Sequence, residues 1–278
     1  MKTLNATLNL SFLWNYLKFL RRQSKGSSLD YPKFVVFNQI IRNNALTTYF
    51  QPIINLKENK LIGYEALNRP PLSSFFPNTE SFYDYIGETN QAFFYEMHCR
   101  NLSLHRYYEE ANNRPMFKDK TIFINIHPQV LVDSSYKAGE TLQLLKELLI
   151  SPTQVVLELT EKKAIKDFKM FKKILDNYRE QGFRVAVDDA GSGYNSLKSI
   201  VQLKPEFIKL DKSLIQHIDS CAEKQKMVSL LHDFAIQSNT SVIAEGIERH
   251  EELAMLQKEG IHYGQGYLLG KPKRELLN

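Results

Sequence analysis

The sequence predicts an α/β fold, a TIM-like (β/α)8 barrel with one antiparallel strand, preceded by a short N-terminal helical segment. From Thr47 onward, eight short apolar segments alternate with longer segments, most of them amphipathic. The units repeat at about 30 residues, the length of one strand, one helix and their loops. Polar residues lie at or near the ends of several apolar segments. An open doubly wound sheet is the alternative fold.

The first 45 residues precede this pattern and contain the apolar stretch LNLSFLWNYLKFL followed by RRQSKGSS. Leu10, Leu13, Leu17 and Leu20 approximate a helical stripe. The stretch is too short and too polar to span a bilayer, which needs about 20 apolar residues, and it lacks a signal-peptide cleavage site. We expect residues 1–45 to be a packing helix and linker, with a membrane-surface or partner-binding helix as the alternative, and residues 46–275 to be the folded domain.

The apolar segments are expected to be strands because they are short and rich in β-branched and aromatic residues. In order they read TYFQPIINL, LIGYEAL, TIFINI, QVVLEL, FRVAVD, FIKL, SVIAE and GQGYLL. Among the intervening helices, FKMFKKILDNYREQG is expected to be amphipathic and to end at Gly182. Its residues on one face are Phe168, Phe171, Ile174, Leu175 and Tyr178.

The first two strands are joined only by KENK, residues 57–60. A crossover between parallel strands needs a dozen or more residues, so these two strands should pair antiparallel. The first strand is therefore the reversed member of the barrel.

Composition limits the classes of protein to which this chain can belong. With 278 residues, 43% of them hydrophobic, the chain can bury the core of one large domain. Its two cysteines, Cys99 and Cys221, are too few for a disulfide framework, which favours a reduced, cytoplasmic location. A net charge of +5 is too mild to indicate DNA or RNA binding.

Polar residues recur near the ends of the predicted strands. In a barrel they meet at the C-terminal mouth, where this fold carries its chemistry. Several carboxylates facing one lysine would protonate unless cations neutralised them. Oxygen ligands without histidine or cysteine indicate Mg²⁺ or Mn²⁺, and a two-metal site is typical of phosphodiester hydrolysis. The residues are Glu65, Asn125, Glu158, Asp188, Asp189, Lys209 and Glu245.

Each feature taken alone also has a purely structural interpretation. DDAGSG, at 188–193, is by itself more often a helix cap and turn than a metal site. Lys209 is harder to explain in this way, because a lysine within FIKL would be buried and costly without acidic partners. The metal-site interpretation therefore depends on the recurrence of these residues in successive units.

Seven motifs, in order along residues 45–273, resemble those of the EAL-domain cyclic-di-GMP phosphodiesterases. They are YEALNR, NIHP, ELTE, DDAGSGYNSL, IKLD, AEGIE and GQGYLLGKP. A single E-A-L tripeptide would carry no information, but seven motifs in the family's order make the resemblance specific. Ala190 stands where the family usually has phenylalanine.

The resemblance implies a bacterial enzyme that opens cyclic-di-GMP to linear pGpG with Mg²⁺ or Mn²⁺. The implied metal ligands are Glu65, Asn125, Glu158, Asp188, Asp189 and Glu245. The implied catalytic residues are Lys209, Glu65, Asp188, Asp211 and Glu248, with Lys209 orienting the water. Arg69 would bind a phosphate, Gln51 and Gln265 would line the substrate groove, and Glu161 would support the DDAGSG loop.

Two functional classes remain open at this point. The first is an active hydrolase, whose partner is its cyclic-di-GMP substrate. The second is a cyclic-di-GMP receptor or protein-interaction module that has kept the fold but lost turnover. We expect neither nucleic-acid binding nor a transmembrane span, and a homodimer through the EAL domain is left open.

Overall fold

The computed structural model describes residues 31–88, 92–126, 139–159, 168–191 and 196–276. The chain divides into two compact units, one of residues 1–47 and 69–95 and one of residues 48–68 and 96–278. The smaller unit contains helices α2 (Tyr31–Arg42) and α3 (Thr79–Glu88). Its core is aromatic: the ring centroid of Phe37 lies 5.8 Å from that of Phe82 and 6.1 Å from that of Tyr95.

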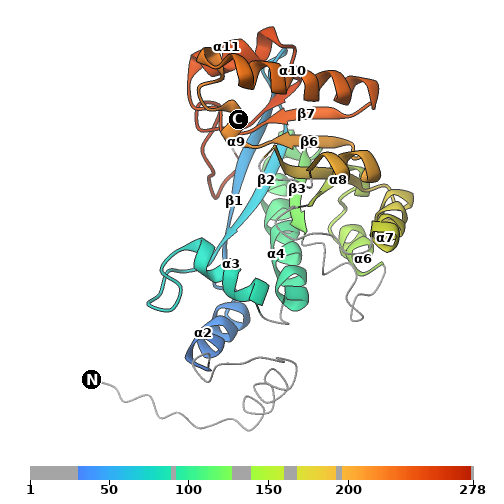
Figure 1. Cartoon of the computed structure of the whole chain (residues 1–278). Coiled ribbons are helices and arrows are strands. Elements are labelled where there is room, and N and C mark those ends of the chain that lie inside the picture. The colour runs from blue at the N-terminus through green and yellow to red at the C-terminus, as the bar shows by residue number, and fades with distance from the viewer. Residues whose placement is uncertain (1–30, 89–91, 127–138, 160–167, 192–195, 277–278) are drawn as a thin grey trace, which may run out of the picture. The chain divides into compact units, whose positions relative to one another are not determined.

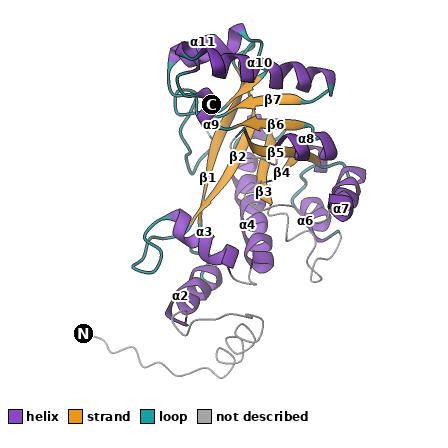
Figure 2. Ribbon diagram, in the orientation of Figure 1, coloured by secondary structure: helices purple, strands orange, loops and turns teal. Residues whose placement is uncertain are grey.

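The larger unit is a closed barrel whose eight strands follow one another in sequence order (Figure 1). This confirms the predicted fold class and excludes the open sheet. Figure 2 shows the strands in orange. They are β1 (Thr47–Asn55), β2 (Lys60–Arg69), β3 (Thr121–Ile126), β4 (Val155–Leu159), β5 (Arg184–Ala190), β6 (Phe207–Leu210), β7 (Ser241–Ala244) and β8 (Tyr263–Gly264).

Strand β1 is the reversed member, as the short KENK connection predicts. Neighbouring strands from β2 to β8 pair in parallel, whereas β1 pairs antiparallel with β8, with Ile54 opposite Gly264. The turn into β2 is closed by Asn55, whose side-chain oxygen accepts hydrogen bonds from the backbone N–H groups of Lys57 and Glu58. An asparagine that bonds the backbone ahead of it is a common way to make a tight turn.

Helices and short turns connect the strands. The α-helices are α4 (Ala92–Asn113), α6 (Glu140–Glu147), α7 (Phe168–Glu180), α8 (Ser196–Leu203), α9 (Lys212–Ile215), α10 (Ala222–Gln237) and α11 (His250–Lys258). The 3-10 turns are η1 (Pro115–Phe117), η2 (Pro152–Gln154) and η3 (Ile218–Ser220). Phe171, Leu175 and Tyr178 of α7 are buried, as predicted. Within the described ranges, no helix has both the length and the apolar character needed to cross a membrane.

Alternate residues of the strands enter two different cores. One set, including Ile122, Val155 and Val185, packs with helix residues such as Leu175 and Val228 in the main core. The other faces the barrel interior, where the rings of Phe123 on β3 and Phe207 on β6 lie 5.3 Å apart although these strands are not neighbours. We call this second cluster the apolar set: Ile53, Phe123, Val156, Ala186, Phe207 and Ile243.

The predicted eighth strand, GQGYLL at 264–269, was misplaced. The strand is Tyr263–Gly264, and the chain turns from Gly266, whose carbonyl accepts a hydrogen bond from the N–H of Leu269 at 3.1 Å. Gly266 lies so close to the backbone of Ile247 that an added Cβ would stand 2.1 Å from its carbonyl oxygen. The glycine therefore allows two loops to pack closely, and the pattern of apolar residues in the sequence does not reveal this contact.

Candidate functional site

A group of polar side chains lies two residues beyond the apolar set, toward the mouth of the barrel. On the parallel strands the pairs include Phe123 with Asn125 and Val156 with Glu158, because residues two apart point to the same face. On reversed β1 the polar partner precedes its apolar one, Gln51 before Ile53. We call these residues the polar set: Gln51, Glu65, Asn125, Glu158, Asp188, Lys209, Glu245 and Gln265.

Lys209 lies at the centre of the polar set. Its side chain is 1% exposed, and its Nζ lies 2.7 Å from Glu245 Oε1 and 2.9 Å from Glu158 Oε1. Glu65 Oε2 and Asp188 Oδ1 follow at 3.2 Å and 3.4 Å. The acidic partners expected for a buried lysine are therefore present, three of them on strands β2, β4 and β5 and the fourth, Glu245, directly after β7.

Hydrogen bonds connect Glu65 with the three amide side chains of the polar set. Its Oε1 accepts a hydrogen bond from Asn125 at 3.2 Å, and its Oε2 accepts one from Gln265 Nε2 at 2.8 Å. The same Gln265 nitrogen lies 3.1 Å from Gln51 Oε1, and Gln51 donates to the Gly270 carbonyl. Sequence reasoning expected Gln51 and Gln265 beside a substrate but missed their contact with each other and with Glu65.

A backbone irregularity allows Asp188 and Asp189 to approach one site. Strict alternation would send neighbouring side chains to opposite faces, but the pairing of β5 with β6 shifts register between Val187 and Ala190. Asp189 takes a left-handed conformation with φ +54°, which aspartate tolerates better than most residues. Carboxylate oxygens of Asp188, Asp189 and Glu245 consequently lie within 4.8 Å of one another.

Burial and neighbouring charges shift the pKa values of these carboxyl groups in different directions. Burial raises the pKa of Asp188, raises that of Glu245 to about 8, and together with the Glu65 charge raises that of Glu158 well above its ordinary value. Burial also opposes ionisation of Glu65, but Lys209, Gln265 and Asn125 hold its pKa below the usual value. Burial alone would lower the pKa of Lys209, yet the surrounding carboxylates raise it well above normal.

The arrangement suits a hard divalent cation. Glu158 is fully buried, and its Oε2 has no hydrogen-bond partner among the described residues. A buried carboxylate oxygen without a partner is costly unless a cation compensates it. The side chains offer carboxylate and amide oxygens, which are the ligands that Mg²⁺ and Mn²⁺ prefer.

Four further predicted residues are not members of the polar set. Asp211 Oδ1 caps helix α9 by accepting a hydrogen bond from the N–H of Ser213. Glu248 is exposed, and Arg69 is the exposed last residue of β2. Glu161 lies outside the described residues. The proposed roles of these four residues stay predictions.

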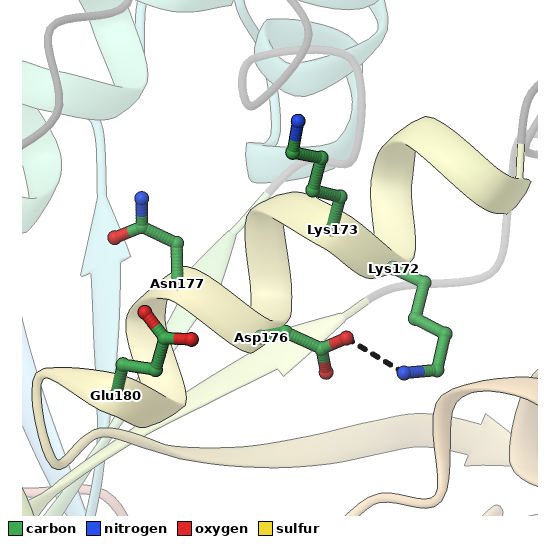
Figure 3. A pocket seen from close by; sticks show the side chains of 5 residues that line it. All are labelled: Lys172, Lys173, Asp176, Asn177 and Glu180. Atoms are coloured by element: carbon green, nitrogen blue, oxygen red, sulfur yellow. Dashed lines mark hydrogen bonds and ion pairs between the residues drawn. The ribbon is translucent and has the colours of Figure 1, made fainter.

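A shallow pocket on α7 provides a contrast with the barrel mouth (Figure 3). Lys172 pairs there with Asp176 of the same helix, with 2.6 Å between Nζ and Oδ2, and both side chains are more than 40% exposed. The pocket-lining residues come from one helix, whereas the polar set converges from six strands and from the residues that directly follow β7 and β8. Convergence of this kind is what marks a candidate active site.

Sequence reasoning also missed Glu252, a carboxylate on α11 that is 2% exposed. Its oxygens accept hydrogen bonds from two loops beside the site. The available signal was its position three residues after Arg249, where a glutamate often accepts from the backbone at the start of a helix.

Comparison with known proteins identifies the family of the chain. Residues 36–272 match the EAL domain family. The Escherichia coli K12 protein named probable cyclic di-GMP phosphodiesterase PdeB is 30% identical over 249 residues, covering 85% of this chain and 45% of PdeB. The chain thus spans less than half the length of that relative.

Solved structures show the same fold. The EAL enzyme Bd1971, bound to cAMP and cyclic-di-GMP, has a TM-score of 0.78 at 27% identity, covering 95% of this chain and 72% of Bd1971. The manganese and cyclic-di-GMP complex of Klebsiella pneumoniae BlrP1 has a TM-score of 0.72 at 27% identity, covering 82% of this chain and 56% of BlrP1. This chain therefore belongs to the EAL-domain family and is homologous to cyclic-di-GMP phosphodiesterases.

Proposed function

We propose that this protein hydrolyses cyclic-di-GMP to linear pGpG in the presence of Mg²⁺ or Mn²⁺, which would lower cyclic-di-GMP signalling. The observation that carries the proposal is the convergence of four carboxylates on the buried ammonium of Lys209, with Asp189 beside them. Such an array of oxygen ligands suits the binding of divalent cations and the hydrolysis of a phosphodiester. The choice of substrate follows from the homologous phosphodiesterases.

The chain's own residues have distinct roles in this proposal. Glu65, Asn125, Glu158, Asp188, Asp189 and Glu245 would hold the cations. Once bound, the cations supply an activated water and stabilise charge on the phosphoryl oxygens. Lys209 orients the water and offsets the negative charge that develops in the transition state. A bond from phosphorus to the water oxygen forms, the bond to a ribose 3′ oxygen breaks, and that oxygen receives a proton.

Other residues would bind or support the substrate. Arg69 can present two parallel N–H groups to a phosphate, which suits its planar guanidinium group. Gln51 and Gln265 would line the groove, Asp211 and Glu248 would support the reaction beside the metals, and Glu161 would support the DDAGSG loop. A cytoplasmic location and a homodimer through this domain stay predictions.

The test is incubation of the purified protein with cyclic-di-GMP and Mn²⁺ or Mg²⁺, with chelator-treated protein as a control. We expect linear pGpG only when metal is present. Glu158→Gln should lose metal binding and hydrolysis, whereas Lys172→Gln, on the exposed face of α7, should retain both. Tight cyclic-di-GMP binding by the wild type without product would instead identify a receptor.

A further inference from the structure

A second buried carboxylate lies outside the polar set, at the start of helix α11. Glu252 Oε1 accepts a hydrogen bond from the His217 N–H at 2.9 Å and another from Arg249 Nε at 3.1 Å. Its Oε2 accepts from the N–H groups of Glu248 at 3.0 Å and Arg249 at 3.1 Å. Four donors therefore satisfy a side chain that is 2% exposed. These bonds keep the pKa of Glu252 below its usual value although burial opposes ionisation.

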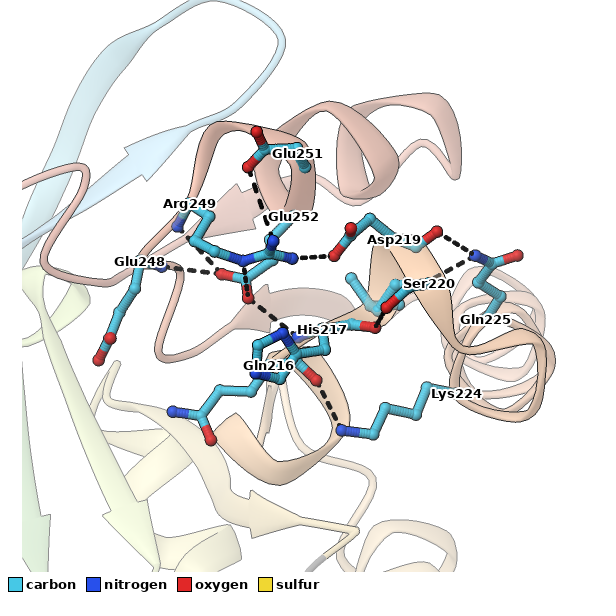
Figure 4. A network of polar contacts seen from close by, with 11 residues as sticks. Gln216, His217, Asp219, Ser220, Lys224, Gln225, Glu248, Arg249, Glu251 and Glu252 are labelled. Atoms are coloured by element: carbon cyan, nitrogen blue, oxygen red, sulfur yellow. Dashed lines mark hydrogen bonds and ion pairs between the residues drawn. The ribbon is translucent and has the colours of Figure 1, made fainter.

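Arg249 extends these contacts to a second segment. Its guanidinium lies between Glu252 and Asp219 and pairs with both (Figure 4). The Glu248 side chain points away from this group, so only its backbone takes part. We define the Glu252 network as Glu252, Arg249, Asp219 and the backbone N–H groups of His217 and Glu248.

The network joins the two segments that carry the closest ion pair of the polar set. His217 and Asp219 follow Lys209 and β6, whereas Glu248 and Arg249 follow Glu245 and β7. Lys209 Nζ lies 2.7 Å from Glu245 Oε1, which is the shortest of the four ion-pair distances of Lys209. The positions of these two side chains therefore depend on how the two segments pack against each other.

Two backbone contacts show how closely the segments approach. The N–H of Glu245 donates to the Leu210 carbonyl at 3.1 Å. Gly246, with φ +70°, lies so close to Lys212 that an added Cβ would stand 2.5 Å from the Lys212 Cβ. The Glu252 network holds the same two segments together at residues further along the chain. Loss of the network would therefore let Glu245 move relative to Lys209.

We propose that Glu252, assisted by Arg249, is a positioning residue that holds Glu245 in register with Lys209 and thereby sets metal affinity and turnover. The effect on turnover rests on the proposed function. The effect on metal affinity can be measured without substrate and does not depend on that function. Glu252 touches neither substrate nor metal in this role. Outer groups that orient metal ligands typically change metal affinity or activity by about 10-fold to 100-fold when removed.

The experiment compares Glu252→Ala with Lys258→Ala, a change at an exposed residue of the same helix that lies outside the Glu252 network. We expect Glu252→Ala to raise the Mn²⁺ dissociation constant about 10-fold in calorimetric titration without substrate, and to lower kcat by a similar factor with KM little changed. Lys258→Ala should stay within about 2-fold of wild type in each quantity. All measurements are made well below the Tm of each variant.

Two further variants keep the result interpretable. Arg249→Ala leaves the backbone donors to Glu252 intact and should weaken Mn²⁺ binding by about 3-fold, whereas Glu252→Gln retains an acceptor oxygen and should fall between wild type and Glu252→Ala. A purely structural Glu252 would lower Tm but leave Mn²⁺ affinity and kcat unchanged, and that result would overturn the inference. If wild type binds Mn²⁺ without hydrolysing cyclic-di-GMP, the proposed function fails while the affinity comparison still decides the role of Glu252.

Discussion

Inside the barrel, the apolar set and the polar set use the same strands at positions two residues apart. Phe123 and Asn125 are on β3, and Phe207 and Lys209 are on β6. The apolar members pack against one another, whereas the polar members form ion pairs and leave Glu158 Oε2 without a hydrogen-bond partner in the described part of the chain. The apolar set is thus satisfied by the folded chain alone, whereas the polar set offers oxygen atoms that a divalent cation could bind.

We therefore expect the apolar set to contribute mainly to stability and the polar set, nearer the mouth of the barrel, mainly to chemistry. Apolar burial stabilises the fold without depending on metal or on the ionisation of side chains, but crowded carboxylates respond to metal and to pH. Substitutions in the apolar set should change stability with little effect on turnover by the folded protein. When metal is present, substitutions in the polar set should lower turnover with little effect on stability.

The largest effect on stability is expected for Phe123→Ala. Removing a fully buried ring that packs against Phe207 should cost about 3–5 kcal/mol in urea unfolding. Asn125→Ala, two residues along the same strand, should instead weaken Mn²⁺ binding with a smaller loss of stability. Equal losses of stability in the two variants would contradict the separation of the layers.

Lys209→Met should have the largest effect on catalysis. The variant keeps an apolar stem but removes the ammonium, so kcat should fall by about 100-fold or more in single-turnover assays with saturating metal. Without metal, its Tm should also fall, because four carboxylates lose their shared cation. A folded variant that hydrolyses at the wild-type rate would refute the catalytic role.

Metal addition should stabilise the wild-type protein. At a free concentration about 100 times its dissociation constant, Mn²⁺ or Mg²⁺ should add about 2.7 kcal/mol, measured as a rise in Tm. Glu158→Gln should reduce this gain, and Lys172→Gln should preserve it. Ca²⁺ should bind but support little hydrolysis, because its larger and looser coordination fits a compact two-metal site poorly. Identical melting curves with and without metal would argue against the site.

A smaller, graded effect is expected from pH in metal-free protein. The raised pKa values of Glu158, Asp188 and Glu245 mean that the folded state retains protons already released by the unfolded chain. Stability should therefore decrease as pH rises from about 5 to about 8. Glu65, with a lowered pKa, and Lys209, with a raised one, exert their effects outside this window.

Urea unfolding at several pH values in the presence of chelator measures this slope. Saturating Mn²⁺ should remove the decrease, since metal binding displaces the retained protons. Stability that rises with pH in the chelated protein would contradict the assignment.

The smallest effect is expected at Asp211, whose carboxylate caps α9. Asp211→Ala should cost about 1 kcal/mol, whereas Asp211→Asn keeps a capping oxygen and should be nearly neutral for stability. The kcat values of the two variants distinguish a helix-capping role of Asp211 from a direct role in the reaction. A fall in kcat with Asp211→Asn at unchanged Tm would indicate a direct role in the reaction, and unchanged turnover would leave only the cap.

The barrel and most of the polar set could be predicted from the sequence because their signals are local. Strand alternation links Val156 to Glu158 and Phe207 to Lys209, and the short KENK connection forces β1 to run antiparallel. Buried charge supplied a further constraint, because Lys209 within FIKL required acidic partners. The EAL-family motifs add expected chemical roles for these residues, which the variants above test.

Only the tertiary structure decided which distant residues meet. The register shift that brings Asp189 beside Asp188, the Gln265 bond to Glu65, and the approach of Gly266 to Ile247 each depend on segments that pair across the fold. Glu252 looks like an ordinary helix-start residue until the loop after β6 brings the His217 N–H to it. Local patterns encode conformation and face, but contact between distant segments depends on how the whole chain packs, which no short stretch of sequence specifies.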